Sequence, residues 1–175
     1  LFAWALLGLV CIRSRVKKSW IPPAIEVLIE KWCSLKSTTH LASVILLASA
    51  YTTLFTWHGI WRFEAYNAHA FDLGNIIQPL WATTRVGFLH CDIDKNSTYL
   101  GEHWAPILGL IGFVYPLFDS PYFIFLIQAL AFASGAIFLW IFAKKKSLPS
   151  EARILVVVCY LAYHPLRASN GYDFR

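Results

Sequence analysis

The sequence predicts an all-α integral membrane protein, built as a multi-pass helical bundle. Hydrophobic residues make up 58% of the 175 residues and charged residues only 14%, a balance that does not suit a surface in water. Aromatic residues reach 17%, and rings such as those of the eight Trp and eight Tyr gather where lipid meets water. The chain starts inside an apolar run and stops without a closing element, so we expect a fragment of a larger membrane protein.

Two spans are expected, at residues 41–61 and 122–143. Neither stretch contains a charged residue, and about 20 residues rising about 1.5 Å each cover a hydrocarbon core of about 30 Å. The second stretch ends in Lys144, Lys145 and Lys146, which is typical of a cytoplasmic helix end. Residues 154–166 are shorter and hold Pro165 near their end, so they predict a partial span or a buried helix.

Charge asymmetry predicts the orientation of these spans. Residues 1–40 are interpreted as a truncated apolar segment, a basic cytoplasmic stretch and an interfacial helix, and they carry six Lys and Arg against two Glu. Residues 62–103 carry five acidic residues against three basic ones. Because Lys and Arg favour the cytoplasmic side, the outer loop at residues 62–121 is predicted to be extracytoplasmic. We expect a multi-pass protein of the cell (inner) membrane.

Residues 104–118 are apolar, but they are too few to cross a bilayer and contain Pro106 and Pro116. A crossing here would also place Lys144 to Lys146 outside, against the charge rule. This stretch therefore predicts a juxtamembrane helix on the outer face.

The candidate site lies in the outer loop. Asp72, Asn75 and Gln78 are three residues apart, so a helix over residues 71–81 would place them on one polar face. A structural alternative is that Asp72 only caps this helix. Glu102 and His103 begin the next surface helix, where they too could serve only as a first-turn charge and an interfacial side chain.

Other residues of the loop give weaker signals. His90, Cys91, Asp92 and Asp94 are metal-ligand types, but their spacing fits no defined site, so they are interpreted as a solvated loop. No cofactor is predicted, and a divalent metal is left open. The net charge of +5 sits in short clusters beside apolar spans, which argues for membrane orientation and against nucleic-acid binding.

Several blocks in this order resemble a known family. They are Phe71-Asp-Leu-Gly-Asn-Ile-Ile-Gln-Pro-Leu-Trp81, Gly101-Glu-His-Trp-Ala-Pro106, Ser120-Pro-Tyr, Gln128-Ala-Leu and Asn170-Gly-Tyr-Asp-Phe174. Over residues 62–175 they resemble the prokaryotic predicted membrane proteins of the domain-of-unknown-function family 2079. That family is in turn similar to the GT-C membrane glycosyltransferases, including dolichyl-phosphate-mannose and lipid A aminoarabinose transferase relatives.

The resemblance implies a fold and a function. Residues 41–175 would be the N-terminal part of a GT-C-like membrane transferase domain, which moves a sugar from a polyprenyl-phosphate donor to an acceptor at the extracytoplasmic face. Asp72 would be the catalytic base, and His103 would offset the charge of the departing phosphate. Asn75, Gln78, Arg85 and Glu102 are expected to bind substrate, with Arg62 as a further candidate cation. Pro79 departs from the pattern and is expected to interrupt the first surface helix.

Two other functions stay open at the level of sequence. A non-catalytic membrane subunit could use the small residues around Gly135 to pack against a partner. A transporter or flippase of lipid-linked solutes would need charged residues inside the spans, and the two predicted spans have no Asp, Glu, Lys or Arg. The expected partners are the lipid bilayer and a polyprenyl-phosphate-linked sugar.

Overall fold

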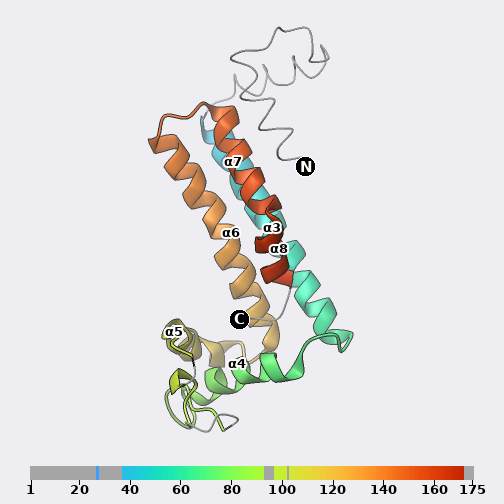
Figure 1. Ribbon diagram of the computed structural model, residues 1–175, viewed down its shortest axis with the longest axis vertical. Coiled ribbons are helices and arrows are strands. Elements are labelled where there is room, and N and C mark those ends of the chain that lie inside the picture. The colour runs from blue at the N-terminus through green and yellow to red at the C-terminus, as the bar shows by residue number, and fades with distance from the viewer. Residues whose placement is uncertain (1–26, 28–36, 93–96, 102, 172–175) are drawn as a thin grey trace. The chain divides into compact units, whose positions relative to one another are not determined.

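The structure, a computed structural model, describes residue 27 and residues 37–92, 97–101 and 103–171. In this part of the chain there are six α-helices and no strand, which confirms the predicted all-helical class. The helices are α3 (Ser37–Glu64), α4 (Ala70–Ala82), α5 (Ile107–Val114), α6 (Pro121–Lys145), α7 (Ser150–Ala162) and α8 (His164–Gly171) (Figure 1). Two short 3-10 segments, η2 (Tyr99–Gly101) and η3 (Tyr115–Leu117), lie between α4 and α6. The predicted organisation of residues 1–40 lies almost wholly outside the described residues.

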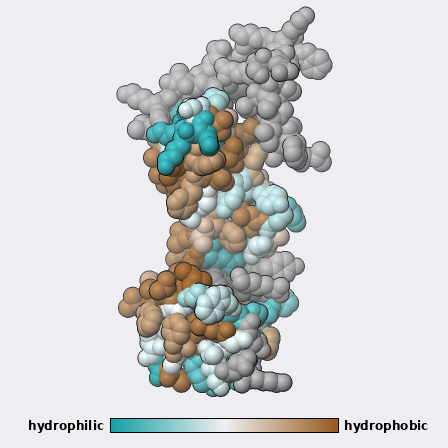
Figure 2. All heavy atoms as spheres, turned by 60° about the vertical axis from the view of Figure 1, so that its left-hand side comes forward, coloured by the Kyte–Doolittle hydropathy of each residue, from teal (hydrophilic) through white to brown (hydrophobic). Residues whose placement is uncertain are grey.

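The two predicted spans lie inside α3 and α6. The stretches Thr39–Glu64 and Pro121–Lys145 are long and apolar enough to cross a membrane. Both helices leave large apolar side chains exposed, among them Leu54 and Trp57 on α3 and Phe138 on α6. Hydrophobic residues accordingly cover much of the face shown in Figure 2. Exposure on this scale is expected where lipid is the solvent.

The chain divides into two compact units. Among the described residues, unit 1 comprises those up to Thr52 together with 131–167, and unit 2 comprises those from Thr53 to Leu130 and from Ala168 onward. The core of unit 1 joins three helices, with Val44 from α3, Ala136 and Trp140 from α6, and Val157 from α7. Beside it, Gly135 is so close to the Tyr160 hydroxyl that a methyl group at residue 135 would overlap that side chain. Small residues on α6 therefore let α7 approach the helix backbone closely.

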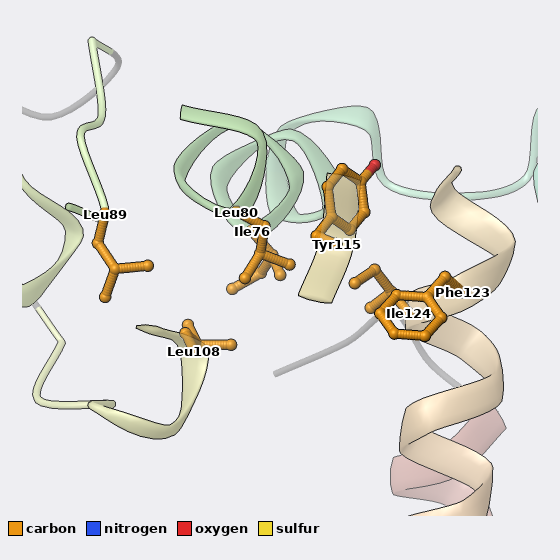
Figure 3. Close-up of a cluster of buried hydrophobic side chains, with 7 residues drawn as sticks. All are labelled: Ile76, Leu80, Leu89, Leu108, Tyr115, Phe123 and Ile124. Atoms are coloured by element: carbon orange, nitrogen blue, oxygen red, sulfur yellow. The ribbon is translucent and has the colours of Figure 1, made fainter. Parts of the chain in front are cut away.

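The core of unit 2 holds the surface helices together (Figure 3). Ile76 and Leu80 come from α4, Leu108 from α5 and Tyr115 from η3. The loop after α4 adds Leu89, and the first turn of α6 adds Phe123 and Ile124. All seven side chains are less than a tenth exposed. The cluster therefore fixes α4 and α5 to the start of the second apolar helix.

The helix predicted at residues 104–118 is shorter in the structure. It consists of α5 followed directly by η3, so the apolar helical stretch is only Ile107–Leu117. Leu108, Gly109, Gly112 and Tyr115 face the protein, whereas Ile107, Leu110, Phe113 and Leu117 are exposed. This division is the amphipathic pattern of a helix that covers a core on one side only.

Two expectations at prolines need correction. Pro79 does not interrupt the first surface helix, since α4 continues through it to Ala82. The C-terminal end of α4 is still hydrogen-bonded, because the Pro79 carbonyl accepts from the Thr83 amide at 3.0 Å and from the Thr83 hydroxyl at 2.7 Å. Proline removes one amide donor but keeps its carbonyl acceptor.

The partial span predicted at residues 154–166 is two helices. Helix α7 ends at Ala162, Tyr163 is extended, and α8 begins at His164. Pro165 stands in the first turn of α8, where its missing amide has no helical partner to lose. The proline therefore stands at the start of a second helix instead of near the end of a single one.

A methyl group at Gly112 is expected to destabilise unit 2. A Cβ there would lie 2.6 Å from the Thr83 hydroxyl oxygen and 2.9 Å from the Thr83 Cβ. Overpacking of this kind costs about 1–3 kcal/mol. We expect Gly112→Ala to lower the free energy of unfolding of the detergent-solubilised chain by that amount.

Gly74→Ala is the matched control, since nothing lies within 4 Å of a Cβ at Gly74. Alanine in a helix interior is about 0.5–1 kcal/mol more stable than glycine, so this variant should be as stable as the wild type or slightly more so. Equal stability of Gly112→Ala and Gly74→Ala would contradict the close packing of α5 on Thr83.

Candidate functional site

The candidate site is built on α4, which has one buried and one polar face. Leu73, Ile76 and Leu80 are buried and follow the three- and four-residue spacing of a helical stripe. Asp72 and Asn75 are only partly buried on the same helix. The predicted helix at residues 71–81 is confirmed, and its apolar side anchors it while the polar side chains remain accessible.

Asp72 lies at the third position of α4. The residue at the N-cap is His69, with extended backbone and no side-chain capping bond, so the prediction that Asp72 caps the helix is wrong in position. Asp72 is nevertheless the acidic residue of the first turn, where its charge is favourable beside the positive end of the helix dipole.

Gln78 is bonded to the loop that follows α4. Its amide nitrogen donates to Asp92 Oδ2 at 3.0 Å, and its carbonyl oxygen accepts from the Cys91 thiol at 3.5 Å. His90 Nε2 lies 2.8 Å from the other oxygen of Asp92. Gln78 therefore fastens residues 90–92 to α4, a role that the sequence did not reveal when it suggested substrate binding alone.

The same loop was interpreted as solvated, and this is wrong for Cys91, which is 1% exposed. Asp92 is exposed, as expected. Within the part of the chain that the structure describes, no three His, Cys, Asp or Glu side chains group closely enough to hold a metal ion. Asp94 and Glu102 lie outside the described residues.

Thr83 and Leu89 organise this loop, and sequence reasoning missed both. The Thr83 hydroxyl donates to the Pro79 carbonyl and accepts from the Leu89 amide at 3.3 Å. Leu89 is fully buried with φ 48°, a left-handed conformation that costs a residue with a side chain about 1–3 kcal/mol. Its carbonyl accepts from the Tyr99 amide at 3.0 Å. An ordinary threonine and leucine in a loop carry no sequence signal for such a turn.

Arg85 provides the cation nearest to the end of α4. Its guanidinium forms an ion pair with Asp119 at 3.1 Å and lies 4.8 Å from the centre of the Trp81 ring. About a third of its side chain is exposed, at 34%. This geometry orients a positive charge and still leaves donors free to meet an anion from solvent.

Arg62 has a different role. One guanidinium nitrogen donates to the Gly171 carbonyl at 2.6 Å, and the other donates to the Asn67 carbonyl at 2.9 Å. The last carbonyls of α8 carry partial negative charge, which favours a cation at this position. Its backbone bonds make Arg62 a structural link and weaken its case as a substrate cation.

His103 lies on the segment between η2 and α5 and is exposed. Its backbone amide donates to the Tyr99 carbonyl at 3.0 Å, and its ring centre is 5.2 Å from that of Tyr99. The ring is thus oriented by an aromatic neighbour without being buried, so it is able to meet a ligand from solvent.

The match to a family model supplies the context for this geometry. A family described as "Predicted membrane protein (DUF2079)" matches residues 62–175, well over half of the chain. The chain belongs to this family. No match was found among curated proteins or among solved structures.

Membership confirms the resemblance seen in the sequence blocks and agrees with the two helices able to cross a bilayer. The matched region begins at Arg62 and so includes α4, its loop, α5 and all of α6 to α8. The protein is therefore a membrane protein whose family has no assigned function.

Burial raises the pKa of the Tyr115 phenol above its ordinary value of 10.0, Asp119 adds to the rise, and Arg85 opposes it. The folded state therefore keeps this proton to higher pH than the unfolded chain does. Its stabilising contribution is complete below about pH 10 and is lost as the pH rises through the folded pKa.

We expect Tyr115→Phe to flatten the decline in the free energy of unfolding between about pH 9 and about pH 11, because phenylalanine cannot ionise. Denaturation of the wild type and the variant in detergent at each pH measures this decline. Tyr163→Phe, at an exposed tyrosine, is the control and should keep the wild-type slope. The same slope in Tyr115→Phe would rule out a role for Tyr115 in alkaline unfolding.

Proposed function

We propose that the protein is a membrane glycosyltransferase that moves a sugar from a polyprenyl-phosphate donor to an acceptor hydroxyl at the extracytoplasmic face. The observation that carries the proposal is the position of Asp72 and Asn75 on α4. They stand on the polar side of a helix whose apolar side is fixed in the core of unit 2. This helix directly follows a helix long enough to span the bilayer. A carboxylate held there meets a lipid-linked donor at headgroup level.

The proposed chemistry is an inverting displacement. Asp72 takes the proton of the acceptor hydroxyl, and the oxygen of that hydroxyl bonds to the anomeric carbon of the donor sugar. The bond between that carbon and the phosphate oxygen breaks, and the electron pair leaves with the lipid phosphate. His103 and Arg85 offset the negative charge that develops there. Asn75 orients the sugar hydroxyls, while Gln78 holds residues 90–92 against α4. Glu102, which precedes His103 in the sequence, is proposed to bind substrate as well.

Charge distribution supports the proposed side of the membrane. Lys144 and Lys145 end α6, which suits a cytoplasmic end, and the preceding loop is predominantly acidic. In this arrangement the prenyl chain stays in lipid of the cell membrane while α4 and α5 meet its phosphate from outside.

The competing proposal of a non-catalytic subunit rested on small residues of α6 as a face for a partner. Ala133 and Ala136 are buried inside the chain, and Gly135 is covered by Tyr160. These contacts account for the small residues without a partner. The transferase proposal therefore takes precedence.

The decisive test is to remove the proton acceptor, the Asp72 carboxylate, and to measure sugar transfer. Membranes that carry the full chain are given radiolabelled polyprenyl-phosphate sugar, and label is measured in the lipid-extractable and polymer fractions. We expect Asp72→Asn to lower transfer by about 10²–10⁴-fold at matched expression, the usual contribution of a general base.

Glu64→Gln is the matched control. It replaces another carboxylate at the start of the outer loop by an amide, and the amide oxygen still accepts from the Tyr122 hydroxyl. This control should transfer at the wild-type rate. Equal transfer by Asp72→Asn and the wild type, or transfer by neither, would overturn the proposal.

A further inference from the structure

Three buried polar atoms in unit 2 have no hydrogen-bond partner within the described part of the chain. They are the Thr56 hydroxyl on α3, the Gln128 carbonyl oxygen on α6 and the Asn170 amide nitrogen on α8. Gln128 is 8% exposed and Asn170 6%. Buried polar atoms are rarely left unsatisfied, so three of them in one small unit require an explanation.

A hydrogen bond brings Gln128 to the residue that precedes Asn170. The Gln128 amide nitrogen donates to the Ser169 carbonyl at 3.0 Å. That carbonyl belongs to the peptide unit linking Ser169 to Asn170, so Gln128 contacts the backbone of α8 next to Asn170. Exchanging the nitrogen and oxygen of Gln128 would break this bond, so its oxygen remains the atom without a partner.

The pairing of α3 with α6 indicates that Thr56 lies at the same height along the helices as Gln128. Glu64 on α3 is bonded to Tyr122 on α6, and a Cβ at Gly59 would touch Phe125. Contacts thus move forward along α6 as they move backward along α3, as in an antiparallel pair. One turn back from Gly59 is Thr56, and one turn forward from Phe125 is Gln128.

The three groups have complementary chemistry. The carbonyl oxygen of Gln128 accepts, the amide of Asn170 donates, and the hydroxyl of Thr56 does either. A single hydroxyl oxygen placed among them would satisfy all three, and a buried water typically makes about three such bonds. Free anions fit poorly, because they offer no proton to the Gln128 oxygen.

We propose that Thr56, Gln128 and Asn170 form a binding site for one hydroxyl group inside the helix bundle of unit 2. Its occupant is either a water molecule or a hydroxyl of a sugar-like molecule. The site is about two turns of helix, or about 10 Å, from the start of α6 at Pro121. It joins the Gln128-Ala-Leu and Asn170-Gly blocks, which the transfer chemistry at Asp72 does not use, and it does not depend on that chemistry.

Side-chain amide NMR tests the site directly. The chain has only four Asn, so selective ¹⁵N labelling in detergent gives four pairs of amide signals, and Asn170→Leu assigns one of them. In the wild type we expect the Asn170 amide protons to show a cross-relaxation peak at the water frequency with the sign of a long-lived contact. A saturable shift of the same signal with methyl glucoside instead would identify a sugar hydroxyl as the occupant.

Thr56→Val keeps the shape of the side chain and should abolish either signal. Thr52→Val is the matched control and should retain it, because the Thr52 hydroxyl donates to the Ala48 carbonyl of its own helix at 3.0 Å. If the Asn170 amide of Thr56→Val keeps the water peak or the glucoside shift, the proposed site is wrong.

The wild-type spectrum decides the question even if Thr56→Val fails to fold. The absence of both the water peak and the glucoside shift would overturn the proposal. A scalar coupling across a direct hydrogen bond from the Asn170 nitrogen to the Gln128 carbonyl carbon would do the same, since it would mean that the two amides pair with each other.

Discussion

The packing of α4 against α5, η3 and the first turn of α6 is the interaction on which the rest of unit 2 depends. Ile76 and Leu80 supply the α4 side of this core, and Tyr115 and Ile124 close it. Burying each such side chain away from water contributes about 1.5–3 kcal/mol. Without this core an isolated helix as short as α4, with 13 residues, would be marginal in water. The polar side of α4 has a defined position only because its apolar side is fixed.

Helices that face lipid cannot rely on the same driving force, because lipid tails are as apolar as the helix surfaces. Close approach and interhelical hydrogen bonds take its place. Gly59 faces Phe125 in unit 2, and Gly135 faces Tyr160 in unit 1, at distances that a methyl group would not allow. The Tyr160 hydroxyl also donates to the Phe132 carbonyl at 2.9 Å. Buried apolar area holds the surface helices to the chain, whereas small residues and single polar bonds join the long ones.

The sequence was most informative where one physical requirement dominates. Length and apolarity were enough to locate α3 and α6, and the three-residue spacing of Asp72, Asn75 and Gln78 was enough to locate α4. It was least informative where a side chain bonds to backbone far away in the chain. Arg62 is an ordinary cation in the sequence, yet it binds the carbonyl of Gly171, 109 residues later. Gln78 likewise looked like a ligand group, and nothing in its pattern indicated that Asp92 and Cys91 would engage it.

Arg62 connects the two polar regions of unit 2. Its bond to Asn67 holds the turn that leads into α4 and Asp72, and its bond to Gly171 holds the residue next to Asn170. One side chain at the end of α3 therefore fixes both the entry to the surface helix and the segment that contacts Gln128. A guanidinium suits this position because it presents several donors in a rigid plane and keeps its charge. A lysine could keep the charge, but its single nitrogen could not hold the two carbonyls in the same fixed geometry.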